Sequence, residues 1–237
     1  ERAHGLALAG GSVFGLAAGD ELALLLSAAG RGLAMGDGLP PVPVVPAAIL
    51  FDLTNGGDKN WGMEPPYRRL TREAFAALGE SDGNGPIGAG FGARAGSRAG
   101  GIGSLSRMLD DGHVVGALVA ANSFGEIYAD APPGDGPVEM PKLARHHRFG
   151  RDNTIIGAVA TNAPLTRAQA LRVAMMAQGG LTRAVRPIHT PFDGDCLFAI
   201  STGAPGLAPV DDVALIEIGT VAADLVAAAV RQAVGLY

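Results

Sequence analysis

The residue of this chain best placed for covalent chemistry is Thr154, which follows the polar, turn-prone run Arg151-Asp152-Asn153 and opens the apolar, β-branched segment Ile155–Thr161. If the Asn153–Thr154 bond is cut, Thr154 gains a free α-amine beside its own hydroxyl, so one residue carries both nucleophile and general base. An α-amine titrates near pH ~8, which makes it a suitable base at neutral pH. The pattern by itself is also typical of an inert threonine at the start of a strand.

Two further places could assist such a nucleophile. Asn122 ends the apolar segment Val114–Ala121, and its amide N–H groups could donate to a developing oxyanion, where losing one donor typically costs about 3 kcal/mol of transition-state stabilisation. The carboxylates of Asp193 and Asp195, on either side of Gly194, could hold an α-ammonium or orient a hydroxyl. A turn-closing asparagine and a solvated Asp-Gly-Asp turn are the simpler explanations of the pattern alone.

Other familiar catalytic and cofactor patterns are lacking. The pair His146-His147 and His189 have no second ligand cluster at zinc-like spacing, and Cys196 stands alone. The glycine-rich run Ile87–Gly96 has neither the Lys-Ser/Thr of a phosphate-binding loop nor the spacing of a dinucleotide fingerprint. No Gly-x-Ser-x-Gly elbow supports a conventional serine triad. We therefore expect neither a metal nor a cofactor.

The composition is that of a globular chain of 237 residues, about half of them hydrophobic, which is enough for a sizeable core. The net charge is −5 and the basic residues are scattered, with lysine only at Lys59 and Lys142, so no nucleic-acid partner is expected. Every apolar region is interrupted before ~18 residues, so no membrane partner is expected either. A single cysteine, Cys196, fits a reducing compartment, and we expect the cytoplasm.

The first third of the chain predicts a strand, a turn and two helices. Leu6–Ala9 is typical of a short buried strand, and Phe14–Ala29 of a helix after a glycine turn. A β-type run follows at Ala47–Leu53. Thr71 is a good N-cap for a helix over Arg72–Leu78.

The middle of the chain is rich in glycine and then in polar residues. We expect a close-packed strand near a ligand at Ile87–Gly96, and an apolar strand at Val114–Ala121. The run Asp130–Arg151 mixes proline, glycine and charge, which predicts an exposed, mobile connection.

The last third predicts two helices and a strand. Thr166 and Gln169 form a capping-box pattern, so a helix should run to about Gln178 and stop at Gly179-Gly180. Leu197–Ser201 is typical of a strand, and Asp211-Asp212 begins a long helix through Gln232. Interspersed strands and helices without an internal repeat predict an α/β or layered α+β domain.

A set of motifs over essentially the whole chain is highly specific as a group: Leu8–Leu16, Val45–Asp52, Gly88-Ala89-Gly90 through Gly100–Ser104, Asn122, Asp152-Asn153-Thr154, Ala160-Thr161-Asn162 and His189–Asp195. With these motifs the chain resembles the DmpA-type aminopeptidase family, which includes β-peptidyl aminopeptidases and nylon-oligomer hydrolases.

The resemblance implies an α+β fold, a layered αββα sandwich of the N-terminal-nucleophile hydrolase type. It implies a single hydrolase domain over residues 1–237 that cuts itself into chains 1–153 and 154–237, and a homo-oligomer. Carried over to this sequence, Thr154 attacks the scissile carbonyl and its α-amine acts as base. Asn122 lines the oxyanion hole, and Asp193 and Asp195 orient the Thr154 amine and hydroxyl. Phe51 lies where some relatives place a pocket tyrosine.

Two departures from the family pattern bear on function. Nylon-hydrolase-like relatives carry a lysine that aligns here with Ser97, and the nearest cation is Arg98, which cannot lose its proton as lysine can. We include both residues, with Phe51, as candidate pocket residues. The chain also begins near the family's Gly-Gly-Ser segment, so we expect the N-terminal part of the family fold to be missing and an edge of the β layer to be uncovered.

We expect an amide hydrolase that acts on short peptides or amino-acid amides through an acyl-enzyme on Thr154. A hydrolase of aminohexanoate (nylon) oligomers is the alternative within the same chemistry. Two further classes stay open: an acyltransferase, because the related ornithine acetyltransferase fold uses a comparable self-exposed threonine, and an inactive binding protein.

Overall fold

The computed structural model describes residues 2–79, 83–132 and 153–236. Most of the predicted connection Asp130–Arg151 lies outside these ranges, and so does the pair His146-His147. The chain falls into two compact units, residues 1–82 (unit 1) and 83–237 (unit 2). Each unit is described by itself, and the predicted single domain and its division at Thr154 stay predictions.

Unit 1 is built on a short parallel strand pair. β1 (Ala7–Ala9) pairs with β2 (Ala47–Ile49), and the crossover contains the 3-10 helix η1 (Ser12–Leu16) and the helix α1 (Ala17–Ala28), as parallel pairing requires. Small apolar side chains of β1 and α1 form its buried core. The strand and helix predicted at Leu6–Ala9 and Phe14–Ala29 are confirmed, the latter as η1 followed by α1.

The second helix of unit 1, α2 (Tyr67–Ala76), begins earlier than predicted. The proposed N-cap at Thr71 is wrong, because the helix is preceded by Pro66 with φ −71°, a value suited to a helix start. Thr71 lies inside α2, where its hydroxyl donates to the Tyr67 carbonyl at 2.8 Å. A threonine hydroxyl bonded to the carbonyl four residues back is a common arrangement within helices.

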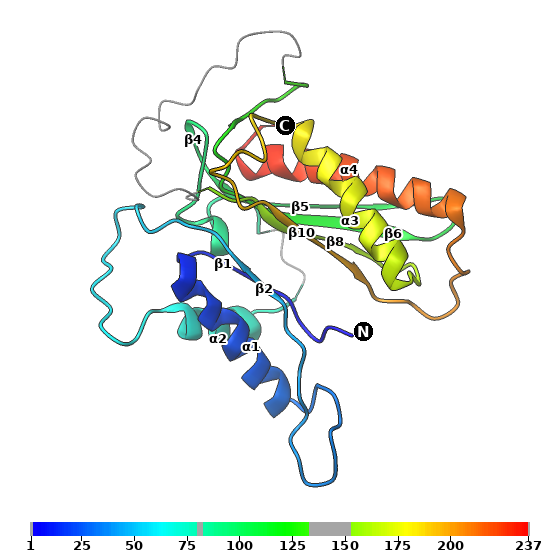
Figure 1. The fold of residues 1–237 in the computed structure, drawn as a ribbon, viewed down its shortest axis with the longest axis horizontal. Helices are drawn as coiled ribbons and strands as arrows, with labels where there is room; N and C mark the ends of the chain where they lie inside the picture. Colours follow the sequence, from blue (N-terminus) through cyan, green and yellow to red (C-terminus); the bar gives the residue numbers. More distant parts are fainter. Residues whose placement is uncertain (1, 80–82, 133–152, 237) are drawn as a thin grey trace. The chain divides into compact units, whose positions relative to one another are not determined.

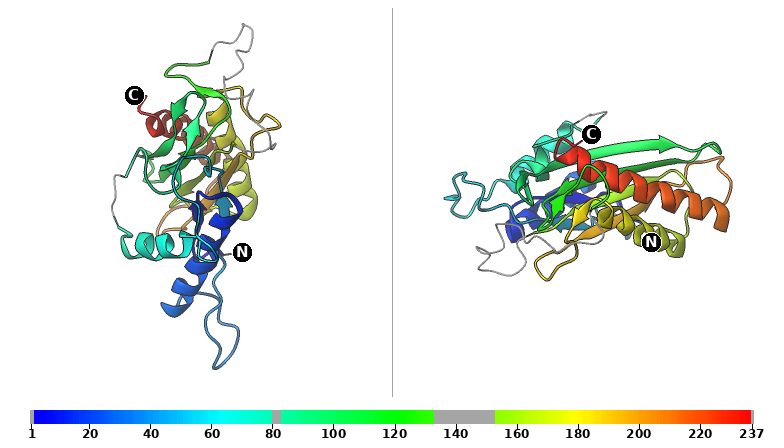
Figure 2. Two further views of the ribbon diagram at one scale, coloured as in Figure 1. Left: turned by 90° about the vertical axis from the view of Figure 1, so that its left-hand side faces the viewer. Right: turned by 90° about the horizontal axis from the view of Figure 1, so that it is seen from above.

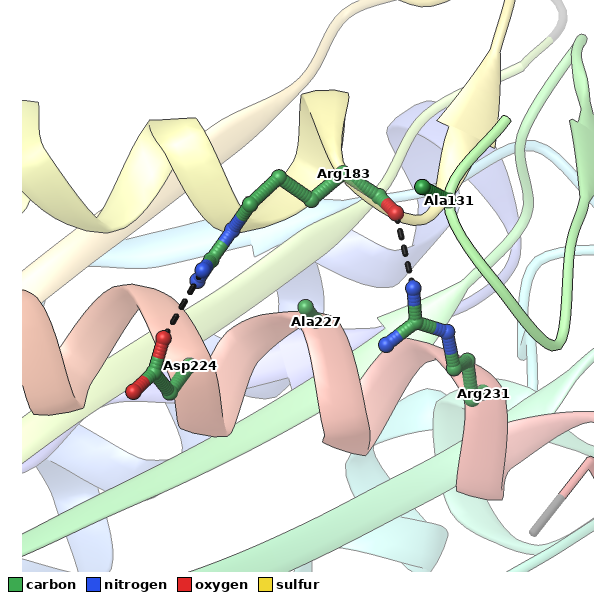
Figure 3. Close-up of a pocket in the computed structure, with 5 residues that line it drawn as sticks. All are labelled: Ala131, Arg183, Asp224, Ala227 and Arg231. Atoms are coloured by element: carbon green, nitrogen blue, oxygen red, sulfur yellow. Dashed lines mark hydrogen bonds and ion pairs between the residues drawn. The ribbon is translucent and has the colours of Figure 1, made fainter. Parts of the chain in front are cut away.

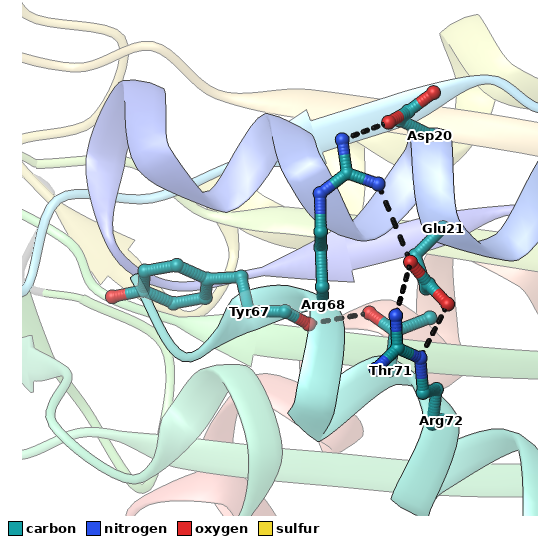
Figure 4. A network of polar contacts seen from close by, with 6 residues as sticks. All are labelled: Asp20, Glu21, Tyr67, Arg68, Thr71 and Arg72. Carbon is teal, nitrogen blue, oxygen red and sulfur yellow. Dashed lines mark hydrogen bonds and ion pairs between the residues drawn. The ribbon is translucent and has the colours of Figure 1, made fainter. Parts of the chain in front are cut away.

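A network of ion pairs joins α1 to α2 (Figure 4). Glu21 is 4% exposed and accepts hydrogen bonds from Arg72 Nε at 2.6 Å and from Arg68 Nη1 at 3.3 Å. Arg68 also pairs with Asp20. The hydrogen bond from Arg72 is the largest cause that lowers the pKa of Glu21. The charge of Glu21 is therefore kept in the folded state.

Unit 2 contains a four-stranded mixed sheet in the order β10-β8-β6-β5 (Figure 1). β5 (Gly101–Met108) and β6 (Val114–Ala121) form an antiparallel hairpin, β8 (Ile156–Thr161) is antiparallel to β6, and β10 (Cys196–Ser201) is parallel to β8. The strands predicted at Val114–Ala121 and Leu197–Ser201 are confirmed.

Two helices form one layer against this sheet, as the views in Figures 1 and 2 show. α3 (Arg167–Thr182) begins with the predicted capping box at Thr166, and α4 (Asp212–Ala233) begins with Asp211 as its N-cap. Alternate side chains of β6, from Val115 to Ala121, enter a core shared with both helices. Among the described residues, α4 alone is long and apolar enough to cross a membrane, but half of its apolar window is buried in this core.

Close helix packing explains part of the glycine density and one wrong prediction. A Cβ at Gly103 of β5 would lie 1.9 Å from the Ala229 carbonyl oxygen of α4. α3 does not stop at Gly179-Gly180 as predicted, because Gly180 packs against α4, where a Cβ would lie 2.3 Å from the Ala223 carbonyl oxygen. Tertiary packing here overrides the low helix propensity of glycine.

The strand predicted at Ile87–Gly96 is wrong for most of its length. Gly88, with φ +48°, turns the chain into the 3-10 helix η2 (Gly88–Gly90), and only Arg94–Ala95 forms a strand, β3, which pairs with β4 (Arg98–Ala99). A second small ladder joins β7 (Glu126–Ile127) to β9 (Val185–Arg186).

Candidate active site

The topology of unit 2 explains why residues far apart in the sequence meet at Thr154. Because β6 is antiparallel to β8, its end at Asn122 lies beside the start of β8. Because β10 is parallel to β8, its start, directly after Asp195, lies beside the same end. The Thr154 N–H donates to the Asn122 carbonyl at 2.7 Å, and the Ile155 N–H donates to Asp195 Oδ1 at 2.8 Å. Thr154 is 8% exposed, and it and the next residue are held by groups at the ends of the two neighbouring strands.

The bond before Thr154 is held by its own set of contacts. Asn153 forms an isolated parallel bridge with Asp193: its N–H donates to the Phe192 carbonyl at 3.2 Å, and its carbonyl accepts from the Gly194 N–H at 2.9 Å. The Thr154 hydroxyl donates to the same Asn153 carbonyl at 2.5 Å. The oxygen of the predicted scissile carbonyl therefore has two donors.

Asn122 is 3% exposed, and two of its oxygens have defined roles. Its backbone carbonyl accepts from Thr154, and its side-chain Oδ1 accepts from the Arg94 N–H at 2.9 Å. The bond to Arg94 identifies Oδ1 as the acceptor end of the amide and Nδ2 as its donor end. The predicted oxyanion role of this group stays a prediction.

Asp193 is occupied by three donors. Its Oδ1 accepts from the Phe124 N–H at 3.1 Å, and its Oδ2 accepts from the N–H and hydroxyl of Thr190 at 2.9 and 2.7 Å. These bonds tie the turn before β10 to the segment after β6. Asp193 thus shapes the loop that contains Gly194.

Asp195 is the most deeply buried acid of the cluster, with a side chain only 1% exposed. Burial is the largest cause that raises its pKa, and the nearby charge of Asp193 adds to it, against the opposing effects of the Ile155 N–H and His189. In the uncut chain, its two oxygens bond to Ile155 and His189, and neither acid bonds to the Thr154 N–H or hydroxyl. Their predicted action on a free Thr154 amine concerns the cleaved chain and stays a prediction.

His189 belongs to the candidate site, although the sequence analysis considered it by itself only as a metal ligand. Its Nδ1 lies 2.9 Å from Asp195 Oδ2, and its backbone adopts φ +55°, in the left-handed region that non-glycine residues seldom use. Within the described residues, no group of three histidine, cysteine or acidic side chains is placed to hold a metal. The structure makes His189 a partner of the buried carboxylate.

The three weaker candidates belong to two different units. Ser97 and Arg98 are exposed on the β3–β4 hairpin, where the Ser97 hydroxyl donates to Glu126 Oε2 at 2.9 Å. The hairpin is bonded to the end of β6, because the Gly96 N–H donates to the Ser123 carbonyl at 3.0 Å. Phe51 belongs to unit 1, just after β2. A pocket role for these three residues stays a prediction.

A hollow of about 290 Å³ is lined by Ala131, Arg183, Asp224, Ala227 and Arg231 (Figure 3). Its charged groups are already paired. Arg183 forms an ion pair with Asp224 at 2.8 Å, and Arg231 donates to the carbonyls of Tyr128 and Arg183 at 2.9 and 2.8 Å. Arg231 thus bonds α4 to the segments that end at Tyr128 and Arg183, so the charged groups of this hollow have a structural role.

The chain belongs to peptidase family S58, because the model of that family matches residues 3–235. It is similar to an uncharacterised aminopeptidase of Mycobacterium leprae (strain TN), with 39% identity over 96% of this chain and 70% of the relative. It is also similar to a 6-aminohexanoate-oligomer endohydrolase of Paenarthrobacter ureafaciens, with 28% identity over 84% of this chain and 60% of the relative. The family and these names are those of hydrolases acting on peptide and amide bonds.

Solved structures agree with this membership. A β-aminopeptidase of Burkholderia sp. gives a TM-score of 0.64 at 28% identity, and it covers 92% of this chain and 62% of its own. The L-aminopeptidase D-Ala-esterase/amidase of Ochrobactrum anthropi, described as a variant of the Ntn hydrolase fold, gives 0.65 at 26% identity with the same coverage. The predicted α+β fold of the N-terminal-nucleophile type is confirmed. The chain spans less than two thirds of the length of these solved structures.

Proposed function

We propose that this chain is a self-processing amide hydrolase of the aminopeptidase type, with Thr154 as its nucleophile. The observation that carries the proposal is the Asn153 carbonyl, which accepts hydrogen bonds from both the Thr154 hydroxyl and the Gly194 N–H. The hydroxyl oxygen thus lies beside the carbonyl that it must attack. The backbone N–H supplies a donor for the negative charge that develops on the carbonyl oxygen.

In the processing reaction, the Thr154 hydroxyl oxygen adds to the Asn153 carbonyl carbon and its proton moves to the departing nitrogen. The C–N bond breaks, which leaves an ester and a free α-amine on Thr154. Water then hydrolyses the ester to the Asn153 carboxylate and the Thr154 hydroxyl. Asn122 and Asp195 already contact the two consecutive N–H groups at Thr154 and Ile155, which supports a fixed position for the nucleophile throughout.

In turnover, the free α-amine of Thr154 takes the hydroxyl proton while the oxygen attacks a substrate amide. The amine product leaves, and water releases the acyl group. The Asn122 carbonyl, which accepts from the Thr154 N–H at 2.7 Å, is placed to accept from the α-amine after cleavage. In this proposal the Asn122 side chain stabilises the oxyanion, and Asp193 and Asp195 act through the loop and the buried charge that surround Thr154.

Thr154→Val and Thr154→Ser form a matched test. Valine keeps the branched shape without the hydroxyl, and serine keeps the hydroxyl without the methyl group. Intact mass under denaturing conditions should give two species for the wild type, residues up to 153 and from 154 onward, two for Thr154→Ser and one for Thr154→Val. A cleaved Thr154→Val chain, or a wild type that is never cut, would contradict the proposal.

The similarity to 6-aminohexanoate-oligomer endohydrolases favours a second candidate with the same chemistry. Hydrolysis of amino-acid p-nitroanilides should be compared with hydrolysis of aminohexanoate oligomers by the cleaved protein. Activity on the oligomers alone would replace the aminopeptidase proposal with this candidate. Acyl transfer to an added amine in preference to water would identify an acyltransferase.

A further inference from the structure

The segment Phe192–Gly194 presents two main-chain groups to the same residue. Its Phe192 carbonyl accepts from the Asn153 N–H at 3.2 Å, and its Gly194 N–H donates to the Asn153 carbonyl at 2.9 Å. One residue that exchanges both of its main-chain groups with the two neighbours of Asp193 forms a parallel bridge. This is the bonding by which an extended peptide adds to an exposed strand edge.

Asn153 is also the first acyl group that Thr154 transfers under the proposed function, on which this inference rests. We infer that the Phe192 carbonyl and the Gly194 N–H form a main-chain acyl subsite, which Asn153 occupies before a substrate does. The acyl residue of a substrate binds there in extended form. Its nitrogen donates to the Phe192 carbonyl, and its carbonyl, the one attacked by Thr154, accepts from the Gly194 N–H.

The spacing of these two groups selects the class of acyl residue. Both bonds form when the nitrogen and the carbonyl carbon are attached to the same carbon, as in the α-amino acid Asn153. In an aminohexanoyl group, several methylene groups separate the nitrogen from the carbonyl, so an extended chain cannot make both bonds. The subsite therefore takes α-aminoacyl groups, as a free amine or as a peptide N–H.

The side chain of Asn153 adds a preference. Asn153 is 7% exposed, and in the part of the chain that the structure describes its Nδ2 is buried without a hydrogen-bond partner. A buried donor without an acceptor weakens binding, whereas an apolar side chain of the same branched shape carries no such cost. Leucine has that shape, so a leucyl residue fits this place better than the asparagine that occupies it.

A side chain at Gly194 would crowd this arrangement. A Cβ at Gly194 would lie 3.1 Å from the Thr154 hydroxyl oxygen, closer than ordinary contact. The absence of a side chain leaves the room in which the hydroxyl and the Gly194 N–H donate to the same acyl carbonyl.

The test uses the cleaved wild-type protein and short peptides as competitive inhibitors of L-leucine p-nitroanilide hydrolysis. Acetyl-Ala-Asn with a free carboxylate mimics the product end at Asn153. Methylation of the asparagine nitrogen removes the N–H that donates to Phe192. The same methyl on the alanine nitrogen is the matched control for peptide conformation, and acetyl-Ala-Leu tests the side-chain preference.

We expect acetyl-Ala-Asn to inhibit competitively and the asparagine N-methyl to raise its inhibition constant by about threefold to tenfold, the range for one hydrogen bond. Acetyl-Ala-Leu should bind about tenfold more tightly than the asparagine peptide. If acetyl-Ala-Asn does not inhibit, or if the two N-methyl groups weaken inhibition equally, the subsite is overturned. The proposed function still stands in that case, provided that the protein turns over its substrate. A protein that is uncut and inactive would overturn both together.

Discussion

Asp195→Asn separates the charge of the buried carboxylate from its shape. In the wild type, Asp195 Oδ1 accepts from the Ile155 N–H at 2.8 Å, and Oδ2 lies 2.9 Å from His189 Nδ1. Asparagine keeps the acceptor for Ile155. Its amide nitrogen then faces His189, whose Nδ1 can accept in the other tautomer. Both contacts stay satisfied, and only the negative charge is removed.

The effect on stability has a defined sign. Because burial raises the pKa of Asp195 in the folded state, its stabilising contribution is present below the pKa of the unfolded chain and is lost as pH rises through the folded pKa. Above its folded pKa the wild type therefore holds a charge at a net cost. Weaker neutral hydrogen bonds offset part of the gain by about 1 kcal/mol each, so we expect Asp195→Asn to be between equal and about 1 kcal/mol more stable.

Asp195→Ala is the matched control, because it removes both acceptors. The Ile155 N–H then lacks its partner, Asp195 Oδ1, which costs about 1–3 kcal/mol. All variants should be compared in the Thr154→Val background, in which every chain is uncut. In urea unfolding between pH 3 and pH 8, the free energy of unfolding of Asp195→Asn should increase relative to that of its parent as the pH rises. A variant that loses stability relative to its parent over this range would refute the reasoning.

The proposed role requires the charge itself. In a chain with Thr154 intact, Asp195→Asn should lose turnover on the order of hundredfold, the usual result of misplacing a reacting group, while it stays folded. Wild-type turnover in a stable Asp195→Asn protein would remove the carboxylate charge from the mechanism. Together, the two measurements distinguish a structural acceptor from a charge that positions the nucleophile.

Two further predictions test contacts inside each unit. Gly180→Ala should destabilise unit 2 by about 1–2 kcal/mol, because overpacking against the Ala223 carbonyl exceeds the gain in helix propensity. Gly179→Ala is the matched control: a Cβ there would meet nothing within 4 Å, so this variant should be about 1 kcal/mol more stable than the wild type. Equal melting temperatures of the two variants would contradict the close packing at Gly180. Glu21→Gln should destabilise unit 1 at pH 7, and the gap should narrow as pH falls through the lowered pKa of Glu21, because its contribution is present above the unfolded pKa. A gap in urea unfolding that does not change with pH would contradict the ion-pair network.

Local signals were sufficient where one segment determines its own structure. The capping box at Thr166 and the start of a long helix at Asp211-Asp212 were predicted from neighbouring residues, and both are confirmed. Thr71 and Gly180 misled because their usual meaning depends on context. A proline pair before Tyr67 starts α2 earlier, and the contact with α4 keeps Gly180 helical. Such tertiary effects cannot be predicted from the local sequence alone.

The candidate site shows the same division. Thr154, Asn122, Asp193 and Asp195 could be named from side-chain types and from the family resemblance, and strand order brings them together. The Gly194 N–H could not be identified in this way, because every residue other than proline has such a group. Only the pairing of Asn153 with Asp193 reveals which N–H faces the carbonyl at the predicted cleavage point.

The two sides of the predicted cleavage point are held by different parts of unit 2, and this division suits the proposed self-processing. On the Thr154 side, the N–H groups of Thr154 and Ile155 are bonded to Asn122 and Asp195, and β8 continues into the centre of the sheet. On the other side, Asn153 has an isolated bridge and a buried amide group without a partner among the described residues. Under the proposal, cleavage would leave the nucleophile fixed by the sheet, and it would leave Asn153 with its two main-chain bonds to Phe192 and Gly194. A substrate whose acyl side chain has no such unpaired buried donor can take the place of Asn153.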